Sequence, residues 1–413
     1  MLNEAANRAA RATLVAARNL FRQRRRALLA MLIICGGVVT FVLAGGFIHW
    51  LLDNMRESTI HSQLGHIQVI RPGYFKKGLG DPYSYLLPSG TEAVSAQPPQ
   101  GMVTITPRLS FNGLLSSGDN TISFMGEGID PEREALVGRS IRIVAGSNLD
   151  GTNDNTVLVG RGLAANVGVQ PGDTVVLLAT TAEGGLNAVE LTVAGLFGTT
   201  VKAYDDAALR VPIETARKLM RVEGATSWVV LLERTADTDA ALASLKARLP
   251  ANEFEPIPWY DLADFYNKTA ELFTRQVGVV RILIALIVVL SISNTLSMAV
   301  VERTGEIGTA MALGVRRAGI LRMFLTEGAL LGVIGGAVGV GLGFLLATAI
   351  SAVGIPMPPP PGMETGFTGR ISVPPTLAWE AFQLAFATTL LASILPAWKA
   401  SRMNIVDALR HQR

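Results

Sequence analysis

A run of 26 residues without a formal charge, residues 27–52, limits the fold of this chain more than any other feature. Its sequence is ALLAMLIICGGVVTFVLAGGFIHWLL, and a helix of this length measures roughly 39 Å at about 1.5 Å per residue. The hydrocarbon core of a bilayer is about 30 Å thick, so the helix can cross it with a tilt. The run exceeds the apolar part of a signal peptide, about 7 to 15 residues, and no convincing A-x-A cleavage site follows. We therefore predict a transmembrane helix.

Three further apolar segments follow in the C-terminal part of the chain. The 413 residues are 49% hydrophobic and 17% charged, which fits a protein lying partly in lipid and partly in water. The predicted organisation is a basic N-terminal helix (1–26), transmembrane helices (27–52, 274–301, 323–355 and 377–398), a large hydrophilic domain (53–273), a loop (302–322), a Pro-rich loop (356–376) and a tail (399–413).

Basic residues flank the spans unevenly and predict their orientation. Lysine and arginine cluster in residues 1–26, 302–322 and 399–413, whereas loop 356–376 has only Arg370. By the positive-inside rule, both termini and loop 302–322 are cytoplasmic, and the hydrophilic domain faces outward. The net charge of +3 is small, and the basic residues lie beside apolar segments, which argues against a nucleic-acid partner.

The hydrophilic domain has the pattern of a mixed α+β fold, since short β-branched runs alternate with turn signals. TVVLLAT and AVELTVAGLF are joined by TAEGGLN, which predicts a hairpin. Residues 262–280 have helical character and should continue into the second span. Other predicted strands are GHIQVI, GMVTITPRL, TISFMGEGI and SWVVLLE, and predicted helices are VGRGLAANVG, PIETARKLMRVEG and TDAALASLKARLP.

Catalytic and metal-binding patterns are missing from the sequence. There is no HExxH, no G-x-S-x-G and no G-x-x-x-x-G-K-[ST], so we expect neither a metal site nor ATP hydrolysis by this chain alone. His61 and His66 are spaced to point to different helix faces, and the adjacent Asp205 and Asp206 favour a turn over a carboxylate pair. The other histidines are His49 and His411, and the single cysteine, Cys35, lies within an apolar run, so it supports neither a disulfide framework nor a metal site.

Loop 302–322 is compact, charged and helix-forming. Glu302 and Glu306 lie one helical turn apart, and Ile307, Ala310 and Met311 form an apolar face. Gly314 should end this helix, with Arg316, Arg317 and Arg322 fixing the next span at the headgroups. The alternative is a solvated loop that only satisfies the positive-inside rule.

Glycines and two charges mark the remaining spans. Two rows of small residues lie four apart in the third span, which predicts close helix packing, either within the protomer or at a dimer seam. The first row is Gly328, Gly332 and Gly336, and the second is Gly335, Gly339 and Gly343. Arg281 and Glu380 begin two spans on the outward side, where each either snorkels to the interface or pairs with the other.

Several segments together resemble one protein family. ERTGEIGTAMALGVRRAGILRMFLTEGALLGVIGG resembles the FtsX/MacB-type (type VII) permeases of ABC transporters, and LPAWKASRMNIVDALR is similar to that family's C-terminal ending. VLVGRGLAANVGVQPGDTVVLL and ALRVPIETARKLM resemble its periplasmic core domain. GHIQVIRPGYF is similar to the lipoprotein-releasing branch, the LolC/LolE permeases, whose layout is the nearest match.

The resemblance implies a bacterial inner-membrane permease with a periplasmic MacB-like core domain, divided into a porter-like part near both of its ends and a β-rich part in its middle. It implies a second permease copy or paralogue, and two ATPase subunits that bind ATP and magnesium, while this chain binds no cofactor. It also places the coupling helix within residues 302–314. The coupling residues are Glu302, Arg303, Glu306, Ile307, Ala310, Met311, Leu313 and Gly314.

Two functions follow as alternatives. In the first, the permease extracts or exports a lipoprotein or another amphiphile by mechanotransmission, with Phe41, Phe47 and Trp50 as candidate substrate contacts unless they pack in the core. A periplasmic lipoprotein, carrier or adaptor is then a partner, although TAEGGLN is too short for a carrier-recruiting hook. In the second, the chain is a cargo-free transmitter that activates a periplasmic cell-wall hydrolase. The size of domain 53–273 favours the first, and a membrane enzyme is the third alternative.

Overall fold

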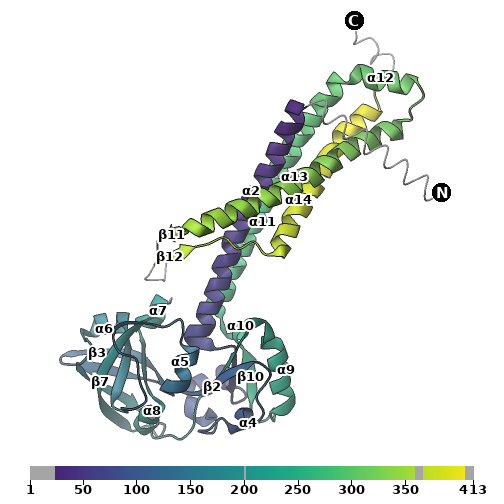
Figure 1. Ribbon diagram of the computed structural model, residues 1–413. Helices are drawn as coiled ribbons and strands as arrows, with labels where there is room; N and C mark the ends of the chain where they lie inside the picture. The colour runs from purple at the N-terminus through teal and green to yellow at the C-terminus, as the bar shows by residue number, and fades with distance from the viewer. Residues whose placement is uncertain (1–23, 200, 359–365, 405–413) are drawn as a thin grey trace. The chain divides into compact units, whose positions relative to one another are not determined.

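The computed structural model describes residues 24–199, 201–358 and 366–404 (Figure 1). The chain divides into two compact units. The helical unit contains residues 24–52, 270–356 and 368–404, and the insertion domain contains residues 53–269 together with 357–367. Most of the predicted N-terminal helix at 1–26, part of the Pro-rich loop and of the tail, and His411 lie outside the described residues.

Four helices of the described chain are long and apolar enough to cross a membrane. Each of them extends beyond the apolar run that predicted it, except α13, which starts earlier and ends two residues sooner, because the charged and polar flanks also favour a helix. The helices are α2 (Arg24–Thr59), α11 (Asp264–Glu302), α13 (Arg317–Val353) and α14 (Pro375–Ser401). A short helix, α12 (Thr304–Ala312), lies between α11 and α13, and a hairpin of β11 (Ile355–Met357) and β12 (Phe367–Gly369) lies between α13 and α14.

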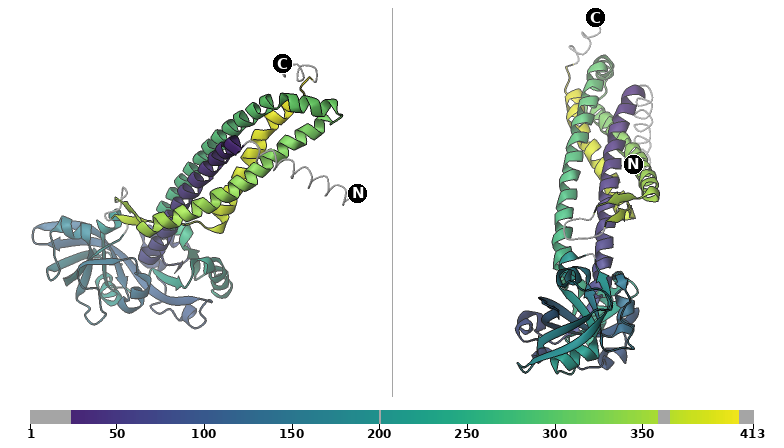
Figure 2. Two further views of the ribbon diagram at one scale, coloured as in Figure 1. Left: turned by 45° about the horizontal axis from the view of Figure 1, so that its top comes forward. Right: turned by 90° about the vertical axis from the view of Figure 1, so that its left-hand side faces the viewer.

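Helix α13 runs beside both α2 and α14 (Figure 2), and each of its two glycine rows faces one of these helices. A Cβ placed on Gly335 would lie 2.9 Å from Cγ2 of Ile34, which belongs to α2. A Cβ placed on Gly328 would lie 2.6 Å from Cβ of Ser393, which belongs to α14. The other members of each row follow the same division, with Gly339 and Gly343 facing α2, and Gly332 and Gly336 facing α14. Of the two predicted uses of these glycines, packing within the protomer is the one that the structure has.

The insertion domain is built on a ten-stranded sheet in the order β10-β1-β9-β2-β3-β8-β5-β7-β4, with β6 pairing β2 and β7. The strands are β1 (Ile67–Ile70), β2 (Met102–Ser117), β3 (Asn120–Ile129), β4 (Arg142–Gly146), β5 (Thr156–Gly160), β6 (Thr174–Thr180), β7 (Leu186–Gly198), β8 (Ala208–Pro212), β9 (Ser227–Leu232) and β10 (Glu255–Pro258). The predicted hairpin forms between β6 and β7, where Thr180 lies opposite Leu186.

Helices and turns of the insertion domain connect these strands. Its first element is the π-helix η1 (Ile60–Leu64), which directly follows α2. The longer helices are α5 (Pro131–Val137), α6 (Arg161–Val167), α8 (Ile213–Met220) and α9 (Thr238–Arg248). The short ones are α3 (Tyr74–Lys77), η2 (Gly78–Gly80), η3 (Pro82–Tyr85), α4 (Glu92–Ser95), α7 (Lys202–Asp205), η4 (Thr235–Asp237) and α10 (Trp259–Leu262).

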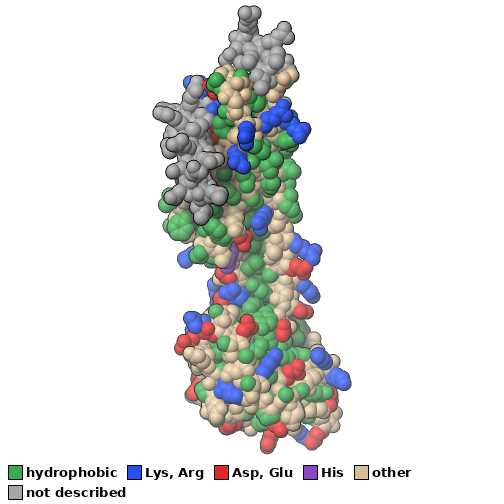
Figure 3. All heavy atoms as spheres, turned by 90° about the vertical axis from the view of Figure 1, so that its right-hand side faces the viewer, with side chains coloured by type: hydrophobic (Ala, Val, Ile, Leu, Met, Phe, Trp, Pro, Cys, Tyr) green, Lys and Arg blue, Asp and Glu red, His purple; other side chains and the backbone are tan. Residues whose placement is uncertain are grey.

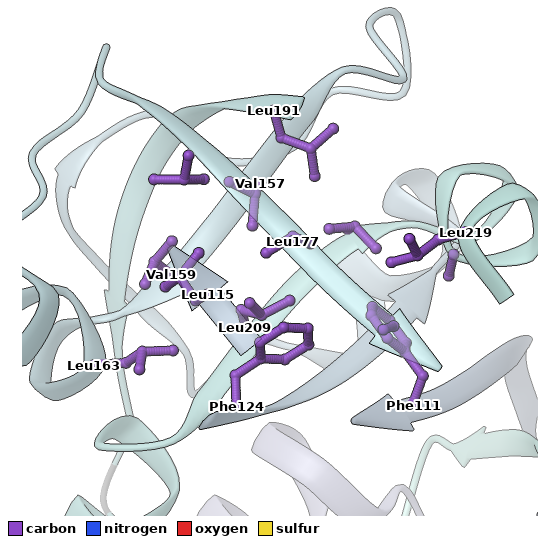
Figure 4. Close-up of a cluster of buried hydrophobic side chains, with 14 of the residues drawn as sticks. Phe111, Leu115, Phe124, Val157, Val159, Leu163, Leu177, Leu191, Leu209 and Leu219 are labelled. Atoms are coloured by element: carbon purple, nitrogen blue, oxygen red, sulfur yellow. The ribbon is translucent and has the colours of Figure 1, made fainter. Parts of the chain in front are cut away.

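The two largest hydrophobic cores of the insertion domain lie against this sheet. One gathers side chains from residues 109–220, among them Phe111, Phe124 and Leu177 (Figure 4). The other gathers residues 67–105 and 225–254, around the fully buried Trp228. The first core belongs to the middle of the insertion domain and the second to its two ends.

Candidate functional site

The turn between α11 and α13 is ordered by its backbone. Arg303 departs from helical geometry (φ −98°, ψ 14°) and separates α11 from α12. Gly314 adopts φ +95°, a left-handed conformation that disfavours any other residue, and its N–H donates to the carbonyl of Met311 at 3.0 Å. The N–H of Val315 donates to the carbonyl of Ala310 at 3.0 Å, which closes the C-terminus of α12. The helix therefore ends where the glycine predicted.

The apolar face of α12 is buried within the chain itself. Ile307 is 3% exposed and Met311 is 8% exposed. They pack in one cluster with Val300, Ile320, Phe324, Ala397 and Ala400 of α11, α13 and α14. Ile307 and Met311, and the half-buried Ala310 beside them, were predicted among the residues that couple to an ATPase, and this part of the prediction needs correction. They seat α12 on its own helices and leave its other face for a partner.

The face of α12 turned away from this cluster is polar, with an apolar tip. Glu302 and Glu306 are exposed, and Leu313 is 83% exposed. Val315 is 44% exposed, and the basic residues beside it, Arg316 and Arg317, are exposed as well. Figure 3 shows basic side chains gathered near the α12 end of the helical unit. An exposed leucine next to charges of both signs can bind a partner that buries the leucine and pairs with the charges.

A buried ion pair holds this turn to α13. Nη1 of Arg303 donates to Oε1 of Glu327 at 3.2 Å, and Nε lies 3.5 Å from Oε2 of Glu306. Glu327 is 4% exposed, within α13. A buried carboxylate is unfavourable unless it is paired, so the contact with Arg303 stabilises the charged form of Glu327. Glu327 was not predicted as a site residue from the sequence. The signal was present, because a single carboxylate within the apolar run FLTEGALLG indicates a basic partner.

A second candidate site is an apolar groove between α2 and the first half of α11. It has a volume of about 470 Å³. Its lining residues are Phe41, Ala44, Gly45 and Ile48 from α2, and Leu272, Arg275, Gln276, Val277, Val279 and Val280 from α11. Arg275 is exposed and pairs with Glu271. Apart from Arg275 and Gln276, the lining residues are apolar. Such a groove suits a hydrocarbon chain.

The structure separates the three aromatic residues predicted to contact substrate. Phe41 lines the groove, but it is only 2% exposed and packs in a hydrophobic cluster of α2, α11, α13 and α14. Phe47 and Trp50 do not line it, and instead lie against each other with ring centroids 6.4 Å apart. The candidate ion pair between Arg281 and Glu380 is also absent: both side chains are exposed, and no ion pair joins them among the described residues. Each lies on an outer face of its helix, which fits snorkelling to the interface.

The histidine and aspartate candidates have structural roles. His61 and His66 were expected on different helix faces, but their ring centroids lie 6.0 Å apart, because the chain turns back at Gly65 (φ +63°) after η1. Within the described residues, no group of three or more His, Cys, Asp or Glu could hold a metal ion. Asp205 accepts hydrogen bonds from Thr199, while Asp206 pairs with Lys202, so the two carboxylates diverge as expected of a turn.

Four apolar helices, a seated turn helix and a large α+β insertion define a multi-pass membrane protein with an extramembrane domain. Residues 278–405 match the FtsX-like permease C-terminal family, and residues 27–248 match the MacB-like periplasmic core domain family. The chain belongs to the FtsX/MacB-type (type VII) permease family of ABC transporters.

Individual relatives cover different shares of the chain. It is 27% identical over 328 residues to the lipoprotein-releasing system transmembrane protein LolC of Xylella fastidiosa, covering 74% of this chain and 77% of LolC. It is 34% identical over 212 residues to the macrolide export ATP-binding/permease protein MacB of Rhodospirillum rubrum, covering 50% of this chain and 30% of MacB. The crystal structure of the periplasmic region of MacB from Actinobacillus actinomycetemcomitans matches with a TM-score of 0.37 and 17% identity, over 52% of this chain and 96% of that one.

Proposed function

We infer that this chain is the membrane subunit of an ABC transporter that extracts or exports a lipoprotein or another amphiphile at the periplasmic side of the inner membrane. ATP would be hydrolysed by two copies of a separate ATPase subunit, which also hold the magnesium, and the chain itself would be non-catalytic. The sequence supports this division of labour, since it contains no phosphate-binding G-x-x-x-x-G-K-[ST] motif.

The observation that carries this proposal is the seated helix α12. Because Ile307 and Met311 fix one side of α12 to α11, α13 and α14, a force applied to its exposed side moves those helices with it. A loosely attached loop would absorb the movement. The exposed surface formed by Glu302, Glu306, Leu313 and Val315 is thus the proposed ATPase contact, on the cytoplasmic side together with both termini.

The cargo follows from the groove and from the relative. LolC is a protein of a lipoprotein-releasing system. The apolar groove between α2 and α11 could hold a lipid chain, because its lining offers almost no hydrogen-bonding partner to a polar ligand. Two permease subunits, identical or paralogous, would face each other in the transporter, as in the family.

The test is co-purification of the full chain with its cognate ATPase, in lipid nanodiscs, followed by mass spectrometry of bound lipid and lipoprotein. Ala44→Phe fills the groove, and Leu32→Phe is the matched control, because Leu32 is on the same helix but 59% exposed and outside the groove. We expect acylated cargo to be retained by the wild type and the control, released on ATP hydrolysis, and lost from Ala44→Phe.

Two results would overturn the proposal. One is retention of no acylated molecule by the wild type. The other is retention that ATP does not change. If the full chain instead bound a purified cell-wall hydrolase and carried no cargo, the signal-transmitter function would replace transport.

A further inference from the structure

Four charged side chains form a buried cluster in the insertion domain. Arg108 of β2 is 3% exposed, Arg210 of β8 is 2% exposed, and Glu134 of α5 is 3% exposed. The fourth member is Glu127 of β3, whose side chain is 20% exposed. Nη2 of Arg210 lies 3.0 Å from Oε2 of Glu127, and Nε of Arg108 donates to Oε2 of Glu134 at 3.2 Å. Tyr204 donates to Glu127 at 3.0 Å.

The cluster holds its charges firmly. Burial alone would raise the pKa of Glu127, but the charges of Arg210 and Arg108 and the hydrogen bond from Tyr204 outweigh it and keep that pKa below its ordinary value. Burial alone would lower the pKa of Arg108, and the charges of Glu134 and Glu127 raise it instead. Glu127 and Arg108 are therefore both ionised at neutral pH.

Both arginines reach beyond their carboxylates to the backbone of η1. Nη2 of Arg210 donates to the carbonyl of Ser62 at 3.0 Å, and Nη1 of Arg108 donates to the carbonyl of Gln63. The N–H of Ser140 donates to the carbonyl of His61 at 3.1 Å. The carbonyls at a helix C-terminus have no partner within the helix, and here three consecutive ones are bound by β2, β8 and the segment after α5.

The π-helix η1 directly continues the first apolar helix, so hydrogen bonds to η1 hold the end of that helix. Helix α2 ends at Thr59 and η1 begins at Ile60, so η1 is the insertion-domain end of the first apolar helix. A buried charge cluster is a poor source of stability, because apolar residues of similar volume would serve as well. Unlike apolar side chains, each guanidinium group is rigid and planar and can donate several directional hydrogen bonds at once.

We propose that Arg108 and Arg210 are positioning residues that fasten the end of α2, through the carbonyls of Ser62 and Gln63, to strands β2 and β8. Movement of the first apolar helix is thereby carried into the sheet of the insertion domain. The transmission part of this inference rests on the proposed transport function, whereas the fastening part stands on the geometry of the insertion domain alone.

The fastening is tested by double electron–electron resonance on the full chain in nanodiscs of phosphatidylethanolamine and phosphatidylglycerol. With Cys35 replaced by alanine, nitroxides are attached at Asn54, in the last turns of α2, and at Ser123, in β3; both positions are exposed. The test variant is Arg108→Lys with Arg210→Lys, which keeps both charges but removes the planar groups that bind carboxylate and carbonyl together. We expect one narrow distance distribution in the wild type and at least a twofold broader one in the double variant.

Two controls separate fastening from stability. Arg234→Lys changes an exposed pair with Asp237 that does not touch η1, and should leave the distribution narrow. Leu177→Ala opens a cavity in the hydrophobic core formed by residues 109–220 and lowers the melting temperature of the domain. It should also leave the distance distribution narrow. A wild-type distribution in the double lysine variant would overturn the fastening, and so would equal broadening in Leu177→Ala. If the double variant does not fold, the single variant Arg210→Lys decides the same question.

Transmission is tested by hydrogen exchange with the cognate ATPase present, with and without ATP and vanadate. We expect the trapped state to change exchange in β2 and β8 of the wild type, and this change to disappear in the double lysine variant while ATP hydrolysis continues. An unchanged response in the variant would overturn the transmission. If the ATPase neither binds nor responds, the proposed transport function fails together with transmission, and the resonance experiment still decides the fastening.

Discussion

Nη1 of Arg303 lies 3.2 Å from Oε1 of Glu327, and this ion pair joins the break between α11 and α12 to the buried face of α13. The side chains are 12% and 5% exposed, so neither charge is well solvated. The ion pair thus holds the N-terminal end of α12, in addition to the apolar contacts that Ile307 and Met311 make with the neighbouring helices.

Removing one partner of this pair should destabilise the helical unit. Arg303→Ala leaves the Glu327 carboxylate in a buried place, and breaking a buried pair costs roughly 3–5 kcal/mol. The double variant Arg303→Met, Glu327→Met should recover most of the loss, because it removes both buried charges. Thermal unfolding of the purified chain in detergent measures this. A double variant no more stable than Arg303→Ala would contradict the role given to the pair.

Changing the exposed tip of the turn should weaken ATPase binding without unfolding the chain. Leu313→Ser removes an 83% exposed side chain, so stability should stay within about 0.5 kcal/mol. If the ATPase buries this leucine, affinity should fall by roughly tenfold, as expected for about 1.5 kcal/mol of apolar contact.

Reversing the charges of Glu302 and Glu306 to lysine should uncouple ATP hydrolysis from transport. Titration of the ATPase onto nanodisc-bound permease measures the loss of affinity in Leu313→Ser, and cargo release per ATP measures the uncoupling.

A matched variant should behave differently at the seat of the same helix. Ile307→Ala creates a cavity beneath α12 and should lower stability by roughly 2–4 kcal/mol. The melting temperature of Ile307→Ala should be clearly below that of the wild type, whereas its affinity for the ATPase should change little while the protein is folded. If Ile307→Ala weakened ATPase binding as strongly as Leu313→Ser while stability stayed unchanged, Ile307 would contact the ATPase and the correction made above would be wrong.

The glycines of α13 should differ sharply in their tolerance of a methyl group. A Cβ on Gly332 would clash with Thr389 and lie 3.1 Å from Cα of Phe386, so Gly332→Ala should destabilise the helical unit by roughly 1–3 kcal/mol. A Cβ on Gly341 would meet open space, so Gly341→Ala should be neutral or slightly stabilising. Melting curves of the two variants, recorded in the same detergent, test this. Equal melting temperatures would contradict the close approach of α13 and α14.

The insertion domain should lose stability in mild acid through His66. Burial first, and the neighbouring charges of His61 and Arg56 next, lower the pKa of His66 from 6.5 to about 4, against the opposing charge of Glu57. Between these values the unfolded chain binds a proton that the folded domain does not, so the free energy of unfolding falls as the pH drops from 6.5 to 4, by about 3 kcal/mol.

The variant His66→Asn supplies the control for this prediction. Asparagine can still accept the hydrogen bond that the N–H of Leu232 donates to Nδ1 of His66, but it does not titrate. Denaturant unfolding of the insertion domain within the full chain, at pH 7 and pH 4.5, should show a smaller pH effect in His66→Asn than in the wild type. An identical pH effect would assign the loss to other groups.

Features encoded by neighbouring residues could be predicted from the sequence. The four apolar helices follow from hydropathy over about 20 residues, and the end of α12 follows from the conformational freedom of Gly314. The β6–β7 hairpin follows from two alternating runs and a short glycine-containing loop. Strands β4, β5, β8 and β10 were not predicted. Each of them is only four or five residues long, and β8 and β10 also contain proline.

Features that join distant residues could not be predicted. Arg108, Glu127, Glu134 and Arg210 are dispersed over about a hundred residues. Only the pairing of β2 with β3 and of β3 with β8, and the packing of α5 on β2, bring them together. Equally, Ile307 and Met311 have the spacing of a docking face, and only the packing of α11, α13 and α14 shows that they face inward. Hydropathy and backbone preferences act locally, so the sequence by itself determined the helices, the hairpin and the family. Burial depends on which elements meet, so the tertiary structure alone decided which side chains are left for a partner and which ones hold η1.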